Sequence, residues 1–213
     1  MNIGIILAAG SSIRFNKQKP KQFLKFNDKM LLEYSLNTFL NHPKIDKVIL
    51  VVSKKHFDFC NKKFKNCEII IGGITRQESS NLALQACPED TKNVLIHDAA
   101  RPFVTNELIS NCIDELNDHI AVCPGLIVTD TLASTNNRKI VKIIDRTNIY
   151  RLQTPQAFNF KVLFDCHNKI NKPVTDDISV VINFGYKPKI IDGNTKNMKI
   201  TYESDLKTIK GIL

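Results

Sequence analysis

The sequence has no tryptophan, no Cys-x-x-Cys pair and no apolar run of membrane-spanning length. The lack of such a run argues against a transmembrane helix in these 213 residues. The six cysteines have no histidines at ligand spacing, so we expect neither a zinc site nor a disulfide framework. The N-terminus also lacks a signal-peptide pattern, and we therefore expect a cytoplasmic protein with reduced thiols and no membrane partner.

Three common signatures of enzyme classes are missing as well. A dinucleotide site needs Gly-x-Gly-x-x-Gly after the first strand, where this chain has only Gly10, and a Walker A loop is absent. The first absence argues against an NAD-dependent oxidoreductase. There is no Gly-x-Ser-x-Gly elbow, and adjacent strand residues such as His97 and Asp98 point to opposite faces, so a Ser-His-Asp hydrolase is not expected.

Positive charge is what the chain has in excess, with a formal net charge of +9. Such a charge suits an anionic partner, which could be a nucleic acid, a phosphorylated metabolite or an anionic lipid. Much of it is spread along the chain, as at Lys54 and Lys55. Because the sequence offers no helix-turn-helix and no aromatic RNA-binding motif, nucleic-acid binding is the less favoured interpretation.

Apolar, β-branched runs alternate with helical patterns along most of the chain. The pattern predicts an α/β fold in one domain, residues 1–213, with a doubly wound, mainly parallel (mixed) sheet covered by helices on both faces. We expect strands at residues 3–7, 48–52, 68–71, 94–96 and 188–192, and helices at residues 30–40, 56–64, 77–86, 106–116, 161–170, 177–184 and 204–212.

The alternation breaks after Pro124. Residues 126–132 and 139–144 are strand-like, and the polar residues 133–138 between them predict a turn, so we expect a β-hairpin arm at about residues 126–147. An isolated hairpin is marginally stable in water, and this arm should therefore pack against something else, such as a second subunit.

Polar motifs follow several of the expected strands, where a doubly wound sheet binds its ligands. The first strand runs into Ala8-Ala9-Gly10-Ser11-Ser12, whose backbone N–H groups could cradle phosphate oxygens, and the basic residues Arg14, Lys19 and Lys21 come next. Asp98 ends another strand and suits Mg²⁺. Thr175, Asp176 and Asp177 open a helix, where an N-cap followed by first-turn acids is a good alternative interpretation. Lys199 lies among apolar neighbours and either extends to solvent or meets an anion.

Taken together and in order, these motifs extend across nearly the whole chain: LAAGSSIRF, PKQF, GGITRQES, VLIHDAARPF, TDT, DR, QTPQAF, VTDD and NMKIT. In these segments the sequence resembles the 2-C-methyl-D-erythritol 4-phosphate cytidylyltransferases of isoprenoid synthesis. The resemblance implies a Rossmann-like nucleotidyltransferase fold with a protruding β-hairpin arm. It also implies transfer of CMP from CTP to 2-C-methyl-D-erythritol 4-phosphate, with release of pyrophosphate and with Mg²⁺ as cofactor.

The resemblance also assigns roles to individual residues. It implies a homodimer in which Thr131 and Arg146 of the arm grip the substrate phosphate in the partner's site. The implied catalytic residues are Arg14, Lys21 and Lys199; the nucleotide-binding residues are Ala8, Ala9, Gly10, Ser11, Gly73, Arg76 and Ser79; the substrate-binding residues are Arg101, Thr131, Arg146, Thr175 and Asp176; and the metal ligand is Asp98.

One position departs from the family pattern. Members often carry a lysine two residues after the threonine of the TDT segment, where this chain has Ala133. A cytidylyltransferase for another polyol phosphate, such as D-ribitol 5-phosphate, is therefore the alternative. Those enzymes tend to have a second glycine in the first loop and an HDSVRP-like segment, so AAG and HDAARP favour methylerythritol phosphate. Some family members are fused to a C-terminal cyclodiphosphate synthase domain, and the chain is either a stand-alone form or a part of such a protein.

Overall fold

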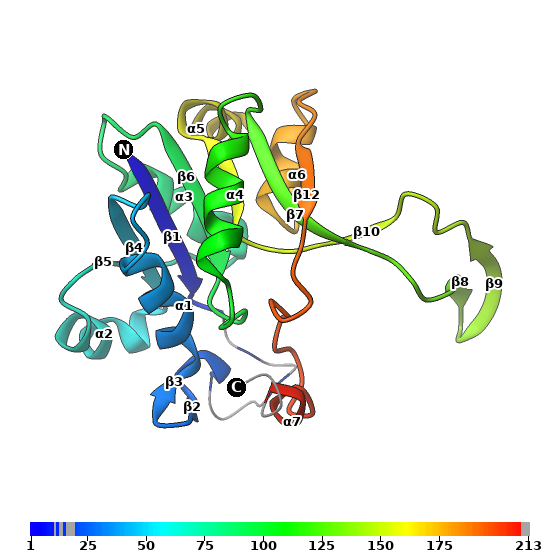
Figure 1. The fold of residues 1–213 in the computed structure, drawn as a ribbon, viewed down its shortest axis with the longest axis horizontal. Helices are drawn as coiled ribbons and strands as arrows, with labels where there is room; N and C mark the ends of the chain where they lie inside the picture. Colours follow the sequence, from blue (N-terminus) through cyan, green and yellow to red (C-terminus); the bar gives the residue numbers. More distant parts are fainter. Residues whose placement is uncertain (11, 13–14, 16–19, 210–213) are drawn as a thin grey trace.

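A mixed, mainly parallel β-sheet forms the centre of the molecule (Figure 1). The computed structural model describes residues 1–10, 12, 15 and 20–209. The strands of this sheet are β1 (Asn2–Ala8), β4 (Lys47–Val52), β5 (Glu68–Ile71), β6 (Asn93–Asp98), β7 (Ala121–Ile127), β10 (Tyr150–Leu152), β11 (Gln156–Asn159) and β12 (Lys189–Asp192). Their order is β10-β7-β11-β6-β1-β4-β5, with β12 also paired to β7. Only β10 and β11 run antiparallel to their neighbours among these strands.

Helices cover both faces of the sheet, as the alternating apolar pattern predicts. Strand residues alternate between two cores: Ile6 and Leu50 face one core, and Ile5 and Val51 face the other. The first core is closed by α1 (Leu31–Leu40), α2 (Phe57–Lys63) and α4 (Asn106–Glu115), and the second by α3 (Arg76–Gln85), α5 (Phe160–Lys169) and α6 (Asp177–Ile182). The predicted doubly wound α/β fold is therefore confirmed.

Shorter elements flank this sandwich near the carboxyl end of β1. A third apolar cluster, formed by Phe15, Phe26, Leu31 and Ile200, joins this region to the C-terminal part of the chain. The short elements are η1 (Lys21–Phe23), β2 (Lys25–Phe26), β3 (Lys29–Met30), η2 (Lys54–His56) and α7 (Asp205–Ile209). Within the described residues, no helix is both long enough and apolar enough to cross a membrane.

A separate hairpin of β8 (Leu132–Asn136) and β9 (Lys139–Ile144) projects from the body (Figure 1). Asn137 and Arg138 form its turn, both with positive φ, as a two-residue hairpin turn requires. The predicted strand at 126–132 is wrong, because β7 ends at Ile127 and β8 begins only at Leu132. The turn is also shorter than predicted. Nearly all of β8 is exposed on both faces, so no burial alternation marks it in the sequence.

Pro124 lies inside β7, where the sequence pattern indicates a break. A proline has no backbone N–H to donate to the hydrogen bonds between strands. Prolines in sheets are therefore confined to positions where no donor is needed. On one side of β7 the partner changes at this point, from β11 at Val122 to β10 at Gly125. The carbonyl of Pro124 still accepts a hydrogen bond from the Gln153 N–H, at 2.7 Å. The junction therefore accommodates the proline, and β7, β10 and β11 make the sheet larger than predicted.

Candidate active site

A cavity of about 600 Å³ opens at the carboxyl ends of β1 and β6. This is the edge of a doubly wound sheet at which ligands bind. Its walls come from the first loop, the residues before α3, the end of β6 and the C-terminal segment. The sequence-predicted residues that line it are Ala8, Ala9, Gly10, Lys21, Gly73, Arg76, Ser79, Asp98 and Lys199.

The buried side chain of Gln22 holds the first loop in shape. Its Nε2 donates to the carbonyls of Ala8 at 2.7 Å and Gly10 at 2.8 Å, and its Oε1 accepts from the Ser12 hydroxyl at 3.0 Å. These bonds leave the backbone of the loop facing the cavity. The sequence reasoning missed Gln22, although the PKQF motif contains it. Of the predicted residues in this loop, Ser11 and Arg14 lie outside the described residues.

Lys21 approaches the cavity from η1. Its Nζ donates to the carbonyl of Ile200, and its backbone N–H donates to the Ser12 hydroxyl at 3.2 Å. The first contact brings the PKQF segment beside the NMKIT segment, which is 179 residues later in the chain. The two predicted catalytic lysines, Lys21 and Lys199, therefore line the same cavity.

A capping box shapes the loop before α3. The Thr75 hydroxyl accepts from the Glu78 N–H at 3.0 Å, and Glu78 Oε2 accepts in return from the Thr75 N–H at 3.3 Å. The same oxygen also accepts from the N–H of Ile74 at 2.7 Å. Gly73 is required by close approach, because a Cβ there would lie 2.4 Å from the Glu78 Cβ. The Ser79 hydroxyl donates to the Thr75 carbonyl at 2.9 Å. These contacts fix the part of the cavity wall that Gly73, Ile74 and Thr75 form.

Asp98 lies at the centre of the charged groups in the cavity. Its Oδ2 is 2.6 Å from Lys199 Nζ, and its Oδ1 is 3.3 Å from Arg76 Nε. Burial of the carboxyl opposes ionisation, but Arg76, Lys199 and Arg101 outweigh it and hold the pKa of Asp98 well below its usual range. Arg76 is also paired with Asp177 of α6. Burial opposes the charge of Arg76, but Asp177 and Asp98 together raise its pKa. The cavity thus holds ionised, mutually paired groups.

The QTPQ segment fixes the end of β6. The Thr154 hydroxyl accepts from the Asp98 N–H at 3.1 Å and contacts His97 Nδ1 at 3.1 Å. Asn197 Nδ2 donates to the Thr154 carbonyl at 2.8 Å, which anchors the segment that carries Lys199. The sequence singled out QTPQ without assigning roles, and its contacts explain why the motif accompanies the others. His97 takes part in no Ser-His-Asp arrangement, since its Nε2 contacts the Arg101 carbonyl at 2.9 Å.

Three of the predicted substrate-binding residues on the body do not line this cavity. Arg101 donates to the carbonyls of Asn197 at 2.9 Å and Leu152 at 3.3 Å. Asp176 caps α6, because its Oδ1 accepts from the Ser179 N–H at 2.9 Å. Thr175 is exposed. The capping interpretation of Asp176 from the sequence is therefore correct.

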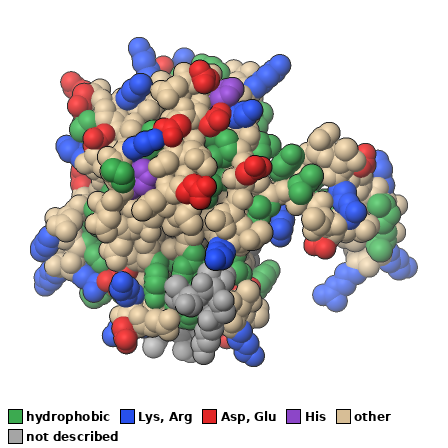
Figure 2. All heavy atoms as spheres, in the orientation of Figure 1, with side chains coloured by type: hydrophobic (Ala, Val, Ile, Leu, Met, Phe, Trp, Pro, Cys, Tyr) green, Lys and Arg blue, Asp and Glu red, His purple; other side chains and the backbone are tan. Residues whose placement is uncertain are grey.

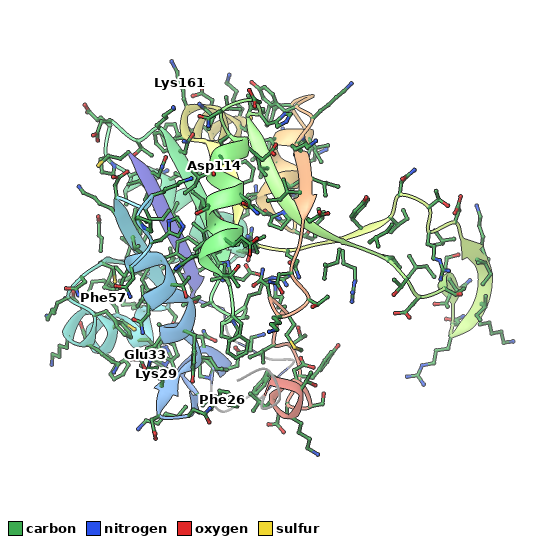
Figure 3. The ribbon with its side chains drawn as sticks, in the orientation of Figure 1. Phe26, Lys29, Glu33, Phe57, Asp114 and Lys161 are labelled. Atoms are coloured by element: carbon green, nitrogen blue, oxygen red, sulfur yellow. The ribbon has the colours of Figure 1, made fainter. Side chains whose placement is uncertain are left out.

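Thr131 and Arg146 belong to the arm and are exposed. Arg146 donates to the Thr129 carbonyl, which fastens the base of the arm. In this chain neither residue reaches the cavity, since the arm extends into open space (Figures 1 and 3). Apolar and basic side chains are both visible on it in Figure 2. Its exposed apolar residues include Ile140, Val141 and Ile143.

A divalent metal could use one ligand here. Among the described residues, no group of three or more His, Cys, Asp or Glu side chains comes together. Of the described residues that line the cavity, only Asp98 supplies a hard, ionised carboxylate oxygen. Such a carboxylate fits Mg²⁺, which commonly takes one or two protein oxygens and completes its shell with phosphates and water.

Comparison with known proteins identifies the family. The family model of 2-C-methyl-D-erythritol 4-phosphate cytidylyltransferase matches residues 3–213. An enzyme of that name from Clostridium botulinum (strain Loch Maree) is 39% identical over 215 residues, covering 96% of this chain and 94% of that protein. The bifunctional enzyme IspD/IspF of Pelagibacter ubique is 44% identical over 207 residues, and this chain spans about half of its length.

The fold agrees with this relationship. The crystal structure of 4-diphosphocytidyl-2C-methyl-D-erythritol synthase from Anaerococcus prevotii superimposes with a TM-score of 0.86 at 28% identity. The match covers 99% of this chain and 95% of that one. None of the relatives named here is a ribitol phosphate enzyme, so the alternative substrate class is not favoured. The sequence match, the shared fold and the cavity at the strand ends agree, and the chain belongs to the 2-C-methyl-D-erythritol 4-phosphate cytidylyltransferase family of nucleotidyltransferases.

Proposed function

We propose that this chain transfers CMP from CTP to 2-C-methyl-D-erythritol 4-phosphate, giving 4-diphosphocytidyl-2-C-methyl-D-erythritol and pyrophosphate. One observation carries the proposal: the cavity gathers the family's motifs from distant parts of the chain. Backbone from the first loop, the wall before α3, Asp98 and two lysines meet there. Residues 1–213 form the nucleotidyltransferase domain, and residues 126–147 are its arm.

The reaction is a substitution at phosphorus. A phosphate oxygen of the polyol phosphate forms a bond to the α-phosphorus of CTP, and the bond from that phosphorus to the bridging oxygen of pyrophosphate breaks. Negative charge builds on the α-phosphate and the leaving group, so positioned cations accelerate the step. Arg14, Lys21 and Lys199 supply them. No covalent enzyme intermediate is needed, because the polyol phosphate is itself the nucleophile.

The nucleotide binds against the two loops of the cavity. The backbone of Ala8, Ala9, Gly10 and Ser11 approaches the phosphates, since small residues leave the N–H groups accessible. Gly73 and Ser79 form the wall for cytosine and ribose. Arg76 belongs to the same loop, and its guanidinium is held by two aspartates in the free chain. Arg76 therefore orients Asp98 beside the phosphates instead of adding an unpaired charge to the wall.

Asp98 holds Mg²⁺ in this proposal, together with phosphate oxygens and water. The ion, when bound, neutralises negative charge on the transferring phosphates. In the free chain, Lys199 contacts Oδ2 of this carboxylate. The Lys199 side chain is 38% exposed and can turn toward a phosphate, which supports its assignment as a catalytic residue.

The second substrate binds where two chains meet. We propose a homodimer in which the arm crosses to the partner and brings Thr131 and Arg146 to the substrate phosphate. The exposed apolar side chains of β9 support this, because an isolated hairpin with such a surface gains stability from burial. Arg101, Thr175 and Asp176 would line the polyol side of that site.

The six cysteines are free, which is consistent with our further proposal of a cytoplasmic location.

Pyrophosphate release measures the proposed function directly. CTP, UTP, ATP and GTP are each combined with 2-C-methyl-D-erythritol 4-phosphate or D-ribitol 5-phosphate, with and without Mg²⁺. We expect release only with CTP, methylerythritol phosphate and the metal. Turnover with ribitol phosphate and none with methylerythritol phosphate would reject the assigned substrate. Release in the presence of EDTA would reject the role of the metal.

Mixed dimers test the crossed arm. Lys21→Ala and Arg146→Ala subunits should each be nearly inactive alone. When the two are co-expressed, a heterodimer contains one site with both residues intact, so activity should recover to about a quarter of the wild-type value if subunits pair at random. Arg138→Ala, at the exposed tip of the same arm, is the matched control and should remain active. Absence of recovery in verified heterodimers argues against a shared site.

A further inference from the structure

The Arg76 side chain connects two aspartates from different parts of the chain. Its Nη1 is 2.6 Å from Asp177 Oδ2 in α6, and its Nε is 3.3 Å from Asp98 Oδ1 at the end of β6. Asp98 lines the cavity, whereas Asp177 does not. Arg76 is therefore held from behind by a residue that no substrate in the cavity can contact directly.

Asp177 is itself fully enclosed by donors. Its side chain is 1% exposed, its Oδ1 is 3.0 Å from His167 Nε2, and its Oδ2 accepts from the Ser80 hydroxyl at 3.3 Å. Its backbone N–H donates to Gln156 Oε1 at 3.2 Å. A carboxylate buried to this extent is costly unless every contact is made, so its geometry is strongly constrained.

The contacts form one continuous line from the interior to the cavity. His167 contacts Asp177, Asp177 contacts Arg76, Arg76 contacts Asp98, and Asp98 contacts Lys199. Lys199 is the exposed end, with a side chain 38% accessible, while the His167 side chain at the other end is 1% accessible. The most accessible member of the line therefore lies at the cavity, and the buried members lie behind it.

This arrangement matters when a phosphate enters the cavity. A phosphate that attracts Lys199 removes one of the two cations on Asp98. The carboxylate keeps its orientation only if Arg76 stays in place, and Arg76 alone could also turn toward the phosphate, because guanidinium binds phosphate well. The charge of Asp177 opposes that movement, since leaving Asp177 buried without its cation is strongly unfavourable.

We propose that Asp177, supported by His167, is a positioning residue that holds Arg76 against Asp98 while Lys199 moves to the substrate phosphate. The expected effect of Asp177 on catalysis rests on the proposed function. The contact by which Asp177 holds Arg76 is present in the free chain and does not depend on that function. Asp177 touches neither substrate nor metal. Its removal should therefore affect the chemical step more than the binding of CTP.

Asp177→Asn tests the inference, because the amide keeps the shape and removes the charge. We expect kcat to fall about tenfold or more, while the dissociation constant of CTP changes less than about threefold. Ile178→Val is the matched control, since Ile178 is buried in the same helix and packs in the core away from the charges. It should lower the unfolding temperature with kcat within about twofold of wild type. Equal effects of the two variants on kcat would overturn the inference.

The combination with Arg76→Gln separates positioning from general destabilisation. If Asp177 acts through Arg76, then Asp177→Asn should lower kcat by less than about twofold further in the Arg76→Gln background. Multiplicative effects of the two substitutions would contradict the inference. His167→Leu removes only the rear contact of Asp177, and it should lower kcat by about threefold, which gives a second variant if Asp177→Asn folds poorly.

A measurement without turnover reads the contact itself. With ¹⁵N-labelled arginine, the Arg76 Nε–H should exchange with solvent about tenfold faster in Asp177→Asn or His167→Leu than in wild type, because a held guanidinium is protected. Unchanged exchange in both variants overturns the inference. A wild-type chain that released no pyrophosphate would reject the proposed function, and the exchange rates would still decide whether Asp177 holds Arg76.

Discussion

Lowering the pH from 7 to 5 should destabilise the protein through His97. The ring of His97 is fully buried beneath the cavity, with Nε2 2.9 Å from the Arg101 carbonyl and Nδ1 3.1 Å from the Thr154 hydroxyl. The Thr154 oxygen also accepts from the Asp98 N–H, so its own hydrogen is available to His97 Nδ1. Burial lowers the pKa of His97 to about 4, because the site favours the neutral ring.

The magnitude follows from proton linkage. The unfolded chain has a histidine pKa of about 6.5, so it binds a proton that the native state excludes. The stability that this site provides is complete above pH 6.5 and is lost as the pH falls toward 4. Between pH 7 and pH 5 the loss is about 2 kcal/mol. The pKa values of Asp98 and Asp177 are also lowered, but these residues affect stability only as the pH approaches the unfolded aspartate pKa of about 3.9. Between pH 7 and pH 5 the change in stability therefore comes from histidine.

Urea unfolding at pH 7 and pH 5 measures the loss, with His97→Gln as the comparison. The glutamine amide retains a donor for the Arg101 carbonyl and cannot ionise. Burial also lowers the pKa values of His42 and His56, but both residues are present in the two proteins and cancel in the difference. Wild type should therefore lose about 2 kcal/mol more than the variant over this interval. Equal losses would refute the assignment of a neutral, buried His97.

Three further substitutions test the cavity walls. Lys21→Ala should lower kcat by about a hundredfold to a thousandfold, far more than the loss of its contact with Ile200 disturbs folding. The exposed Lys25→Ala control should keep normal turnover, and steady-state kinetics decides this. Gly73→Ala should weaken CTP binding in calorimetry by about tenfold or more, because the added Cβ displaces Glu78 from its capping position. Gln22→Ala leaves two loop carbonyls without their donor, and urea unfolding should show a loss of about 1–3 kcal/mol.

The sheet and its helices could be predicted because buried positions recur as a regular pattern of apolar residues in the sequence. Residues 48–52 are apolar throughout, and Val48 and Leu50 contact one core while Ile49 and Val51 contact the other. A strand that is buried on both faces consists of a nearly continuous run of apolar residues. The arm lacks this signal, since almost all of β8 is exposed and the residues before it pair with nothing regular. Its boundaries were therefore the least predictable part of the fold.

The site is predictable in outline and not in detail. Motif order indicates that the first loop, Gly73, Asp98 and Lys199 meet, and they line one cavity. The partner of each side chain depends on contacts between segments far apart, such as Arg76 with Asp177, 101 residues later. No local pattern records such a pair. The supporting role of Gln22 is equally hidden, because a buried glutamine and an exposed one look the same in a sequence.

The excess positive charge of the chain does not come from the paired charged groups in the cavity. In the free chain, Asp98 and Asp177 balance Arg76 and Lys199, so these groups add little net charge to the cavity. Pairing of this kind prevents a buried ion from being left without a partner before substrate arrives. If Lys199 turns toward a substrate phosphate, as proposed above, it exchanges one anion for another, and Asp98 keeps Arg76 as its partner. The pairing of Asp98 with two cations thus agrees with the proposal that its carboxylate is ionised and able to hold a metal ion.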